Sequence, residues 1–199
     1  MRYLVLSDVH GNLPALEKVL QQEKSEVDTY INLGDVVNYA PWSNECVELI
    51  ADLKPCVNIQ GNHEVYFLEG KCQVKHPLVP KFFEKSFEGF KYHDLISKYK
   101  ISMLVEGMKC VHTIGNQYVF HDSEISIQEN SFIGHSHQQY KRDFGDLILV
   151  NPGSIGQNRK YINVSNYMIW DSSKNTFDLK SFTFDIEIVI NEMRSRKYP

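Results

Sequence analysis

The sequence predicts an α/β fold in which two halves of the chain each supply one β-sheet. Up to about residue 60, short apolar runs alternate with stretches of helical spacing, a pattern typical of parallel strands joined by right-handed crossovers. From Ile101 onward, short strand-like runs follow one another with glycine turns between them. The 199 residues suit one domain and contain neither repeats nor linkers, so we expect a single domain over residues 1–199.

The first half is predicted to hold three strands and two helices. The run Tyr3–Leu6 has four uninterrupted apolar residues, which indicates a strand buried on both faces. Apolar residues then recur at helical spacing in Leu13–Glu23, and a second helix is expected at Ser43–Leu53. The other two strands are expected at Thr29–Leu33 and Val57–Ile59.

The rest of the chain is predicted to change from helices to strands and to end in a helix. The stretch Val65–Lys100 is rich in Phe and Tyr, and we expect two or three helices there whose aromatic residues pack inward. The basic last turn of Ile186–Arg196 suits a helix C-terminus. Between them, the expected strands are Ser102–Glu106, Met108–His112, Gln117–Phe120, Ser131–Ile133, Gln139–Phe144, Leu147–Val150, Asn166–Trp170 and Thr176–Phe182.

Composition argues against several classes of function. The net charge of −4 provides no basic footprint for a nucleic-acid polymer, so we expect no such partner. No apolar run approaches the roughly 20 residues of a membrane span, and the N-terminus begins in a strand rather than a signal peptide. The four cysteines lack metal-binding or disulfide spacing, so we expect reduced thiols and a cytoplasmic protein.

Polar side chains follow each predicted strand of the first half. Asp8 and His10 come directly after the first strand, and because alternate residues of extended backbone point to the same side, they could hold one metal ion. Gly34–Asp35 and Gly61–Glu64 follow the next two strands. Each motif alone is compatible with an ordinary strand-end turn or helix cap. Three of them at the carboxyl edge of one parallel sheet favour a functional site.

Imidazoles follow two predicted strands of the second half. His112 ends one strand, and Gly134–His137 follows another. His135 and His137 again alternate, so both rings could face one cavity, and paired neutral imidazoles suit intermediate divalent metals. His121 also follows an apolar run, but His112 continues directly from its strand and is the preferred candidate.

These motifs, in this order, resemble those of the calcineurin-like metallophosphoesterases. The resemblance spans residue 1 to about residue 160 and is closest to small, single-domain bacterial and archaeal phosphodiesterase-like members. It implies a four-layer αββα sandwich with two mixed β-sheets and two divalent metal ions, with manganese expected and iron, nickel or zinc as alternatives. It also implies the ligands: Asp8, His10 and His137 for one ion, Asn62, His112 and His135 for the other, and Asp35 as the bridge.

The resemblance also implies roles for residues beside the ligands. His63 is expected to be catalytic, contacting the substrate or protonating the leaving group. Asn12 and Arg159 are expected to bind substrate, although Asn12 could instead hold its loop and Arg159 could be an exposed turn residue. Glu64 could orient a ligand histidine or act as a helix N-terminal acid. The chain departs from the family's usual residues, without losing a ligand, at Asn38, Thr113 and Ser136.

The implied activity is metal-dependent phosphoester hydrolysis by a water-derived nucleophile held between the two ions. No cap domain or long insertion is visible, so small phosphodiesters are the expected substrates, such as cyclic nucleotides, 2′,3′-cyclic phosphates or dinucleoside polyphosphates. One alternative is a phosphomonoesterase or protein phosphatase with the same site. Another is a non-catalytic scaffold similar to the metallophosphoesterase-like subunit of retromer. The helical segments could also form a homo-oligomer interface.

Overall fold

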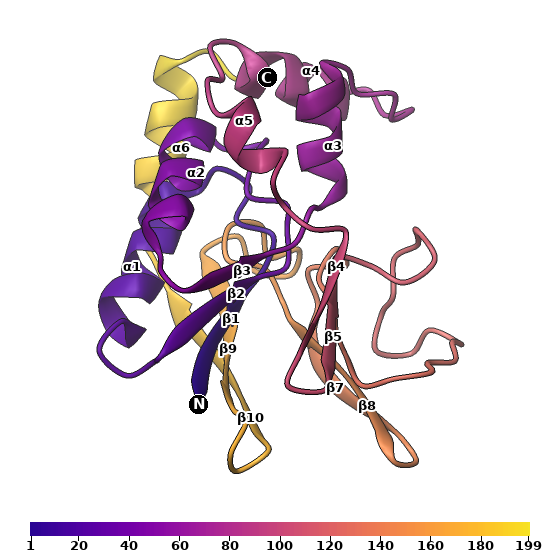
Figure 1. Ribbon diagram of the computed structural model, residues 1–199. Helices are drawn as coiled ribbons and strands as arrows, with labels where there is room; N and C mark the ends of the chain where they lie inside the picture. The colour runs from indigo at the N-terminus through magenta and orange to yellow at the C-terminus, as the bar shows by residue number, and fades with distance from the viewer.

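The computed structural model describes all 199 residues and contains two five-stranded β-sheets that face each other (Figure 1). The first sheet has the order β10–β9–β1–β2–β3. Strands β1, β2 and β3 are parallel, whereas β9 runs antiparallel to both of its neighbours, so the sheet is mixed. Its strands are β1 (Arg2–Leu6), β2 (Thr29–Asn32), β3 (Cys56–Asn58), β9 (Val164–Asp171) and β10 (Thr176–Thr183).

The second sheet is also mixed and has the order β4–β5–β6–β8–β7. Its three central strands are parallel, and each edge strand pairs antiparallel with its neighbour. The carboxyl ends of the central strands therefore share one edge of this sheet. Its strands are β4 (Ser102–Val105), β5 (Met108–Val111), β6 (Ser131–Phe132), β7 (Gln139–Phe144) and β8 (Leu147–Pro152).

Side chains of β1 alternate between two apolar layers. Leu4 and Leu6 belong to the large core between the first sheet and the helices. Tyr3 and Val5 belong to a second core between the two sheets, together with Phe132 of β6. Burial on both faces explains why this strand reads as a continuous apolar run.

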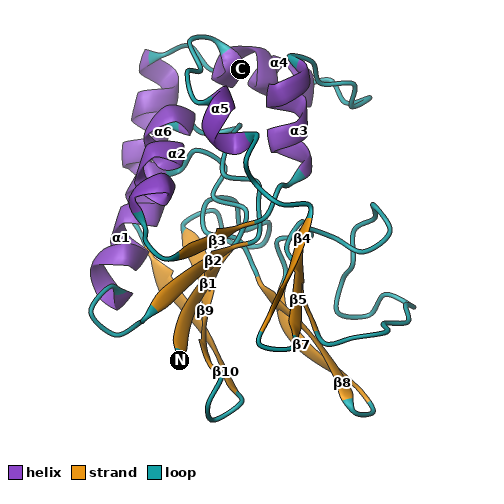
Figure 2. Cartoon of the chain, viewed as in Figure 1, coloured by secondary structure: helices purple, strands orange, loops and turns teal.

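Helices contribute to only one of these layers (Figure 2). All six supply residues to the core that contains Leu4 and Leu6, including Phe67 and Phe83 from the aromatic stretch. The predicted helix over residues 13–23 begins where the Asn12 side chain accepts a hydrogen bond from the backbone N–H of Ala15. The helices are α1 (Leu13–Glu23), α2 (Ser43–Asp52), α3 (Asn62–Glu69), α4 (Val79–Phe87), α5 (His93–Ile96) and α6 (Ile186–Ser195).

The far side of the second sheet is covered by the loop of residues 113–130 instead of a helix. Val119 of this loop is buried in a small cluster with Ile133, Tyr140 and Leu149. The Tyr140 hydroxyl donates a hydrogen bond to the Val119 carbonyl at 2.7 Å, which holds the loop down. The α/β class and the two mixed sheets are confirmed, and a loop takes the place of the outermost helical layer on this side.

Two sequence predictions about the strands are wrong. The halves of the chain do not supply one sheet each, because β9 and β10 join the first sheet. Strand β1 has two edges to pair and β2 occupies only one of them, so β9 pairs with the other. Residues Gln117–Phe120 form a loop and not a strand. Strand β6 pairs directly with β5 and β8, which leaves no edge between them for an additional strand.

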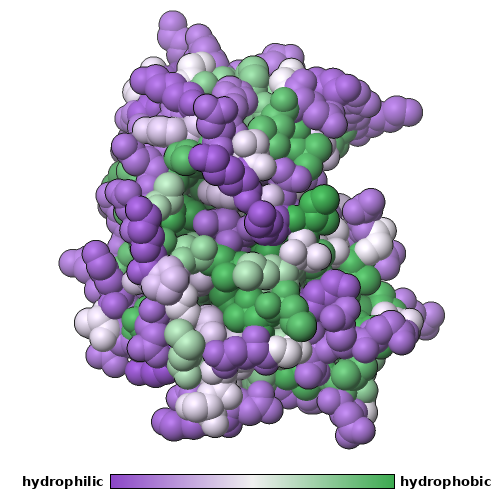
Figure 3. Space-filling model, viewed as in Figure 1, coloured by the Kyte–Doolittle hydropathy of each residue, from purple (hydrophilic) through white to green (hydrophobic).

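The surface is mainly hydrophilic, with apolar residues gathered where the edge strand β4 lies (Figure 3). Ile101, Met103 and Leu104 are exposed there. Exposed apolar residues on an unpaired strand edge are a feature of protein-contact surfaces. No helix of the chain combines the length and hydropathy that crossing a membrane requires.

Candidate metal centre

The loops that follow the parallel strands of both sheets converge on one group of Asp and His side chains. Asp8 and Asp35 follow β1 and β2, while His112 and His135 follow β5 and β6. The loops are tied together across the sheets, because the backbone N–H of His135 donates to Asp8 Oδ2 at 3.0 Å. There is no room for a side chain at Gly134, since a Cβ there would lie 1.9 Å from Ser7 Oγ. The backbone of the loop after β6 therefore packs directly against the side chains of Ser7 and Asp8 after β1.

The first donor cluster consists of Asp8, His10 and His137, whose donor atoms all lie within 4.8 Å of one another. All three residues are buried. Asp8 Oδ1 is 3.2 Å from His137 Nε2 and 3.7 Å from His10 Nε2. The two Nε2 atoms are 3.1 Å apart.

Backbone carbonyls fix which ring nitrogen of each histidine faces this cluster. His10 Nδ1 lies 3.3 Å from the Val37 carbonyl, and His137 Nδ1 lies 2.6 Å from the Gln157 carbonyl. A carbonyl only accepts, so each Nδ1 carries a proton and each Nε2 faces the cluster. Burial and the neighbouring His137 hold the pKa of His10 well below its usual value, which keeps His10 neutral. The Nε2 lone pair of His10 thus points into the cluster, where a metal ion would accept it.

The second donor cluster consists of Asp35, His112 and His135. His112 Nδ1 donates to the Leu33 carbonyl at 2.7 Å, and its Nε2 lies 3.2 Å from Asp35 Oδ2. This carboxylate overcomes the effect of burial and raises the pKa of His112 to about 10. Asp35 also forms a third group with His10 and His63, so it lies between the two clusters.

Asn62 Oδ1 is buried without a hydrogen-bond partner, and two other buried atoms, Asp8 Oδ1 and His112 Nε2, make no hydrogen bond and face His137 Nε2 and Asp35 Oδ2 respectively, each 3.2 Å away. Buried polar atoms in folded proteins are normally paired, because an unpaired one costs about 1–3 kcal/mol. All three atoms are possible metal ligands. Asp8 Oδ1 belongs to the first cluster, His112 Nε2 belongs to the second, and Asn62 follows Gly61 as the first residue of α3. The mixed oxygen and nitrogen donors fit intermediate divalent ions such as manganese, iron, nickel or zinc.

His63 faces the same site with its tautomer fixed by Asn38. Asn38 Oδ1 accepts from the backbone N–H of Tyr39 at 2.7 Å, which turns the amide nitrogen toward His63 Nδ1, also at 2.7 Å. Nδ1 is therefore an acceptor, and the single proton of the neutral ring lies on Nε2. Nε2 is 3.9 Å from Asp35 Oδ2. Burial lowers the pKa of His63, which makes it a neutral hydrogen-bond donor at the site.

Glu64 holds two of the site loops together and does not orient a histidine. Its carboxylate accepts from the backbone N–H groups of Asp35 at 2.8 Å, Val36 at 2.7 Å, Val37 at 3.4 Å and Gly61 at 2.8 Å. The side chain is fully buried, and burial together with the Asp35 charge raises its pKa while these N–H donors oppose that shift. Glu64 thereby fixes the loops after β2 and β3 relative to each other.

The backbone at the site is left-handed, which corrects the extended geometry assumed from the sequence. Five of the predicted ligands have φ between 51° and 66°. Asp8 and His10 share the first cluster as expected, but the other alternate pair is divided, because His135 joins the second cluster and His137 joins the first. Non-glycine residues adopt this conformation at a cost, and such strain is concentrated at functional sites. The five ligands are Asp8, His10, Asp35, His135 and His137.

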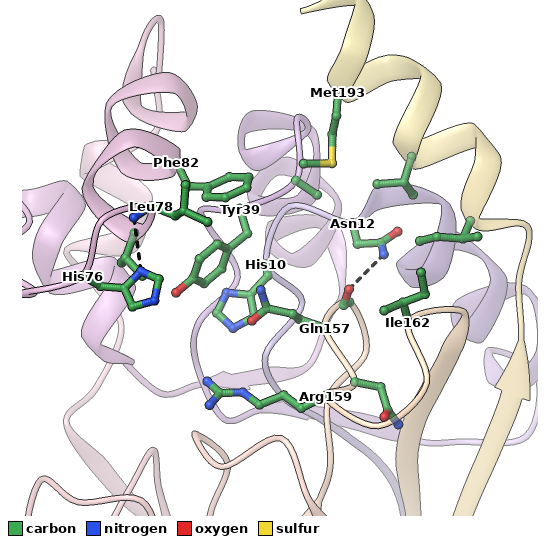
Figure 4. A pocket seen from close by; sticks show the side chains of 16 residues that line it. His10, Asn12, Tyr39, His76, Leu78, Phe82, Gln157, Arg159, Ile162 and Met193 are labelled. Carbon is green, nitrogen blue, oxygen red and sulfur yellow. Dashed lines mark hydrogen bonds between the residues drawn. The ribbon is translucent and has the colours of Figure 1, made fainter. Parts of the chain in front are cut away.

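Asn12 and Arg159 both line a pocket that reaches His10 (Figure 4). Both polar atoms of the Asn12 amide are already engaged, with Ala15 N–H and with the Gly156 carbonyl at 3.1 Å, so this side chain holds its loop. Arg159 is exposed and its guanidinium lies 5.2 Å from the ring centroid of Tyr118. A role for either residue in substrate binding stays a prediction.

Two residues beside the site were not predicted from the sequence to take part. Tyr118 stacks on His135 with ring centroids 4.1 Å apart, and Asn38 fixes the tautomer of His63. Asn38 has a φ of 77°, a conformation that favours Gly or Asn. The only signal for Asn38 in the sequence was that it replaces the glycine usual in the family. Tyr118 lies in the loop mistaken for a strand. The rival histidine, His121, is exposed and lies outside the donor clusters.

This fold, with Asp and His clusters at the strand ends, is that of a metallophosphoesterase. The calcineurin-like phosphoesterase superfamily domain matches residues 1–175, and the chain belongs to this superfamily. An uncharacterized protein of Methanocaldococcus jannaschii is 29% identical over 98% of this chain and 93% of its own length. The phosphodiesterase YfcE of Escherichia coli K12 is 26% identical over 78% of this chain and 79% of its own. The crystal structure of a metallophosphoesterase from Sphaerobacter thermophilus shares the fold, with a TM-score of 0.81 over 100% of this chain and 95% of the other, at 23% identity.

Proposed function

We propose that this chain is a phosphodiesterase that uses two divalent metal ions to hydrolyse small phosphodiesters. The observation that carries the proposal is the pair of donor clusters with Asp35 between them. The similarity to a phosphodiesterase over most of the chain supports a diester substrate. Manganese is the ion we expect, because the donors are carboxylates, an amide and imidazoles without any thiolate.

The proposed ligand sets follow the two clusters. One ion takes Asp8, His10 and His137, and the unpartnered Asn62 Oδ1 joins the second cluster around the other ion. Asp35 bridges them. When bound, two such ions activate a water molecule as a nucleophile and neutralise charge on the phosphoryl oxygens.

The residues beside the ligands supply positioning and a proton. His63 presents a proton on Nε2 toward the site, where it can donate to a phosphoryl oxygen or to the leaving-group oxygen. Asn38 keeps that proton on Nε2. Arg159 has no ion-pair partner in the protein, so its charge is available for a phosphate oxygen.

The test compares bis-p-nitrophenyl phosphate with p-nitrophenyl phosphate, using metal-stripped protein to which single metals are added back. We expect manganese-dependent cleavage of the diester and loss of that activity in Asp35→Asn. Asp146→Asn, an exposed turn residue, is the matched control and should behave like the wild type. Absence of diester cleavage with every metal, in protein that binds two ions per chain, would overturn the proposal.

Two alternatives differ in their outcome in the same assay. A phosphomonoesterase or protein phosphatase would use the same ligands and would cleave the monoester faster. A non-catalytic scaffold is favoured by one observation, the exposed Ile101, Met103 and Leu104 on β4. The full set of metal donors favours the enzyme, since a scaffold has no need to retain it.

A further inference from the structure

The pocket that reaches His10 is lined largely by hydrophobic side chains. It has a volume of about 530 Å³, within the range of about 300–1,000 Å³ usual for small-molecule sites. Nine of its sixteen lining residues are hydrophobic. The aliphatic part of the wall combines the start of α4, the loop after Asn158 and one face of α6. These aliphatic and thioether side chains are Leu78, Val79, Ile162, Ile186, Val189 and Met193 (Figure 4).

The mouth of this pocket is continuous with the metal centre. His10, a member of the first donor cluster, is one of the lining residues. Arg159 is the only Lys or Arg among them. A ligand with its phosphate at the clusters and its anionic oxygen near Arg159 would therefore direct a substituent into the apolar wall (Figure 4).

The aliphatic end of the pocket offers little for recognising a nucleobase, because the free polar groups of the lining, the Tyr39 hydroxyl and the Gln157 amide, lie beside His10 (Figure 4). Asn12 is tied to Gly156 and Ala15, and Asn158 donates to Asn166 Oδ1 at 2.6 Å and accepts from the backbone N–H of Lys160 at 2.8 Å. Tyr39 and Phe82 meet edge to face at 5.7 Å and do not form parallel walls for a stacked base. Base recognition relies on free hydrogen-bonding groups and on stacking, so the wall favours a flexible hydrocarbon.

We infer that this site takes phosphodiesters in which one ester group is an alkyl chain, seated against Ile186, Val189 and Met193. The inference rests on the proposed phosphodiesterase function and deepens it, because it names the class of substrate. Arg159 would be a positioning residue at the mouth, and the aliphatic wall would set specificity.

The experiment measures binding of methyl, butyl and hexyl phosphate to manganese-loaded protein by calorimetry. Burying one methylene contributes about 0.8 kcal/mol, which is about fourfold in Kd. We expect Kd to fall by about that factor per methylene and by at least tenfold from methyl to butyl. Equal Kd values for methyl and butyl phosphate would overturn the inference.

Two isoleucines of α6 provide a matched pair of variants. Ile186 lines the pocket, whereas Ile188 is 51% exposed and lies outside it. Ile186→Gln should flatten the dependence of Kd on chain length, and Ile188→Gln should leave that dependence as in the wild type. If both variants retain the full dependence, the chain binds elsewhere and the pocket assignment is wrong.

Cleavage assays separate failure of the pocket from failure of the proposed function. We expect hexyl p-nitrophenyl phosphate to have a higher kcat/KM than both methyl p-nitrophenyl phosphate and the p-nitrophenyl ester of thymidine 5′-phosphate. Preference for the thymidine ester would overturn the alkyl assignment while supporting a phosphodiesterase. No cleavage of any ester, together with chain-length-dependent binding, would refute the enzyme but keep the hydrocarbon pocket.

Discussion

Replacing Glu64 by glutamine tests whether this buried carboxylate holds the two loops of the site together. Its two oxygens accept four backbone N–H groups, two at each oxygen. In Glu64→Gln, either orientation of the amide places an NH₂ group against two of those donors. Each buried donor left without an acceptor costs about 1–3 kcal/mol, so two of them cost about 2–6 kcal/mol. Relief of the repulsion between Glu64 and Asp35 offsets part of this, and we expect about 2–4 kcal/mol.

The assay is urea unfolding of metal-free protein, read as the change in midpoint at constant slope. Glu69→Gln is the control on the same helix, because Glu69 is about half exposed and a surface change there costs less than about 0.5 kcal/mol. Metal affinity should also fall by about 10–100-fold in Glu64→Gln, since Asp35 loses its backbone anchor. A Glu64→Gln protein as stable as the control would refute the reasoning, because the two hydrogen bonds lost at the amide nitrogen would then contribute nothing.

Three other perturbations test the site and its support. Asn38→Gly keeps a residue that suits the left-handed backbone but removes the hydrogen bond that fixes the proton of His63 on Nε2. We expect kcat to fall about tenfold with little change in KM. An unchanged kcat would show that Asn38 does not position His63. Tyr167→Phe should destabilise the protein by about 1–2 kcal/mol at pH 8, because the Tyr167 hydroxyl donates to buried Glu23 at 2.6 Å. Burial raises the pKa of Tyr167, so this contribution is complete below the usual tyrosine pKa near 10 and is lost as pH rises further; urea midpoints of the two proteins should converge at high pH. Saturating divalent metal should stabilise folded protein by about 2.7 kcal/mol per site at a hundredfold excess over Kd, seen as a rise in Tm; no rise with any ion would contradict a metal centre.

Much of the site could be predicted because its information is local in sequence. Asp8, Asp35 and His112 each follow an apolar run directly, and the parallel arrangement of those runs brings their ends to one edge. The order of these motifs also indicated the superfamily. Neither conclusion required the conformation of the loops to be known.

What could not be predicted depends on contacts between distant segments. Three of the four partners of Glu64 are backbone groups on the loop after β2, and a sequence does not reveal which N–H groups lack an acceptor. The left-handed φ values of the ligands occur at non-glycine residues, so no residue type in the sequence marked them. The prediction placed β9 in the wrong sheet, because the apolar pattern of a strand does not indicate which other strand it pairs with. The pocket beside His10 combines residues 10 to 193, so only the folded chain displays it.

Because β1 lies between β2 and β9, the first sheet cannot form completely during translation until β9 has been synthesised. Strand β1, near the start of the chain, pairs on one side with β2 and on the other with β9, which begins at Val164. During synthesis, the apolar edge of β1 therefore stays unpaired until β9 has emerged. Unpaired apolar strand edges favour aggregation. The first donor cluster also cannot assemble before His137 and Gln157, whose carbonyl orients the His137 ring, have been synthesised.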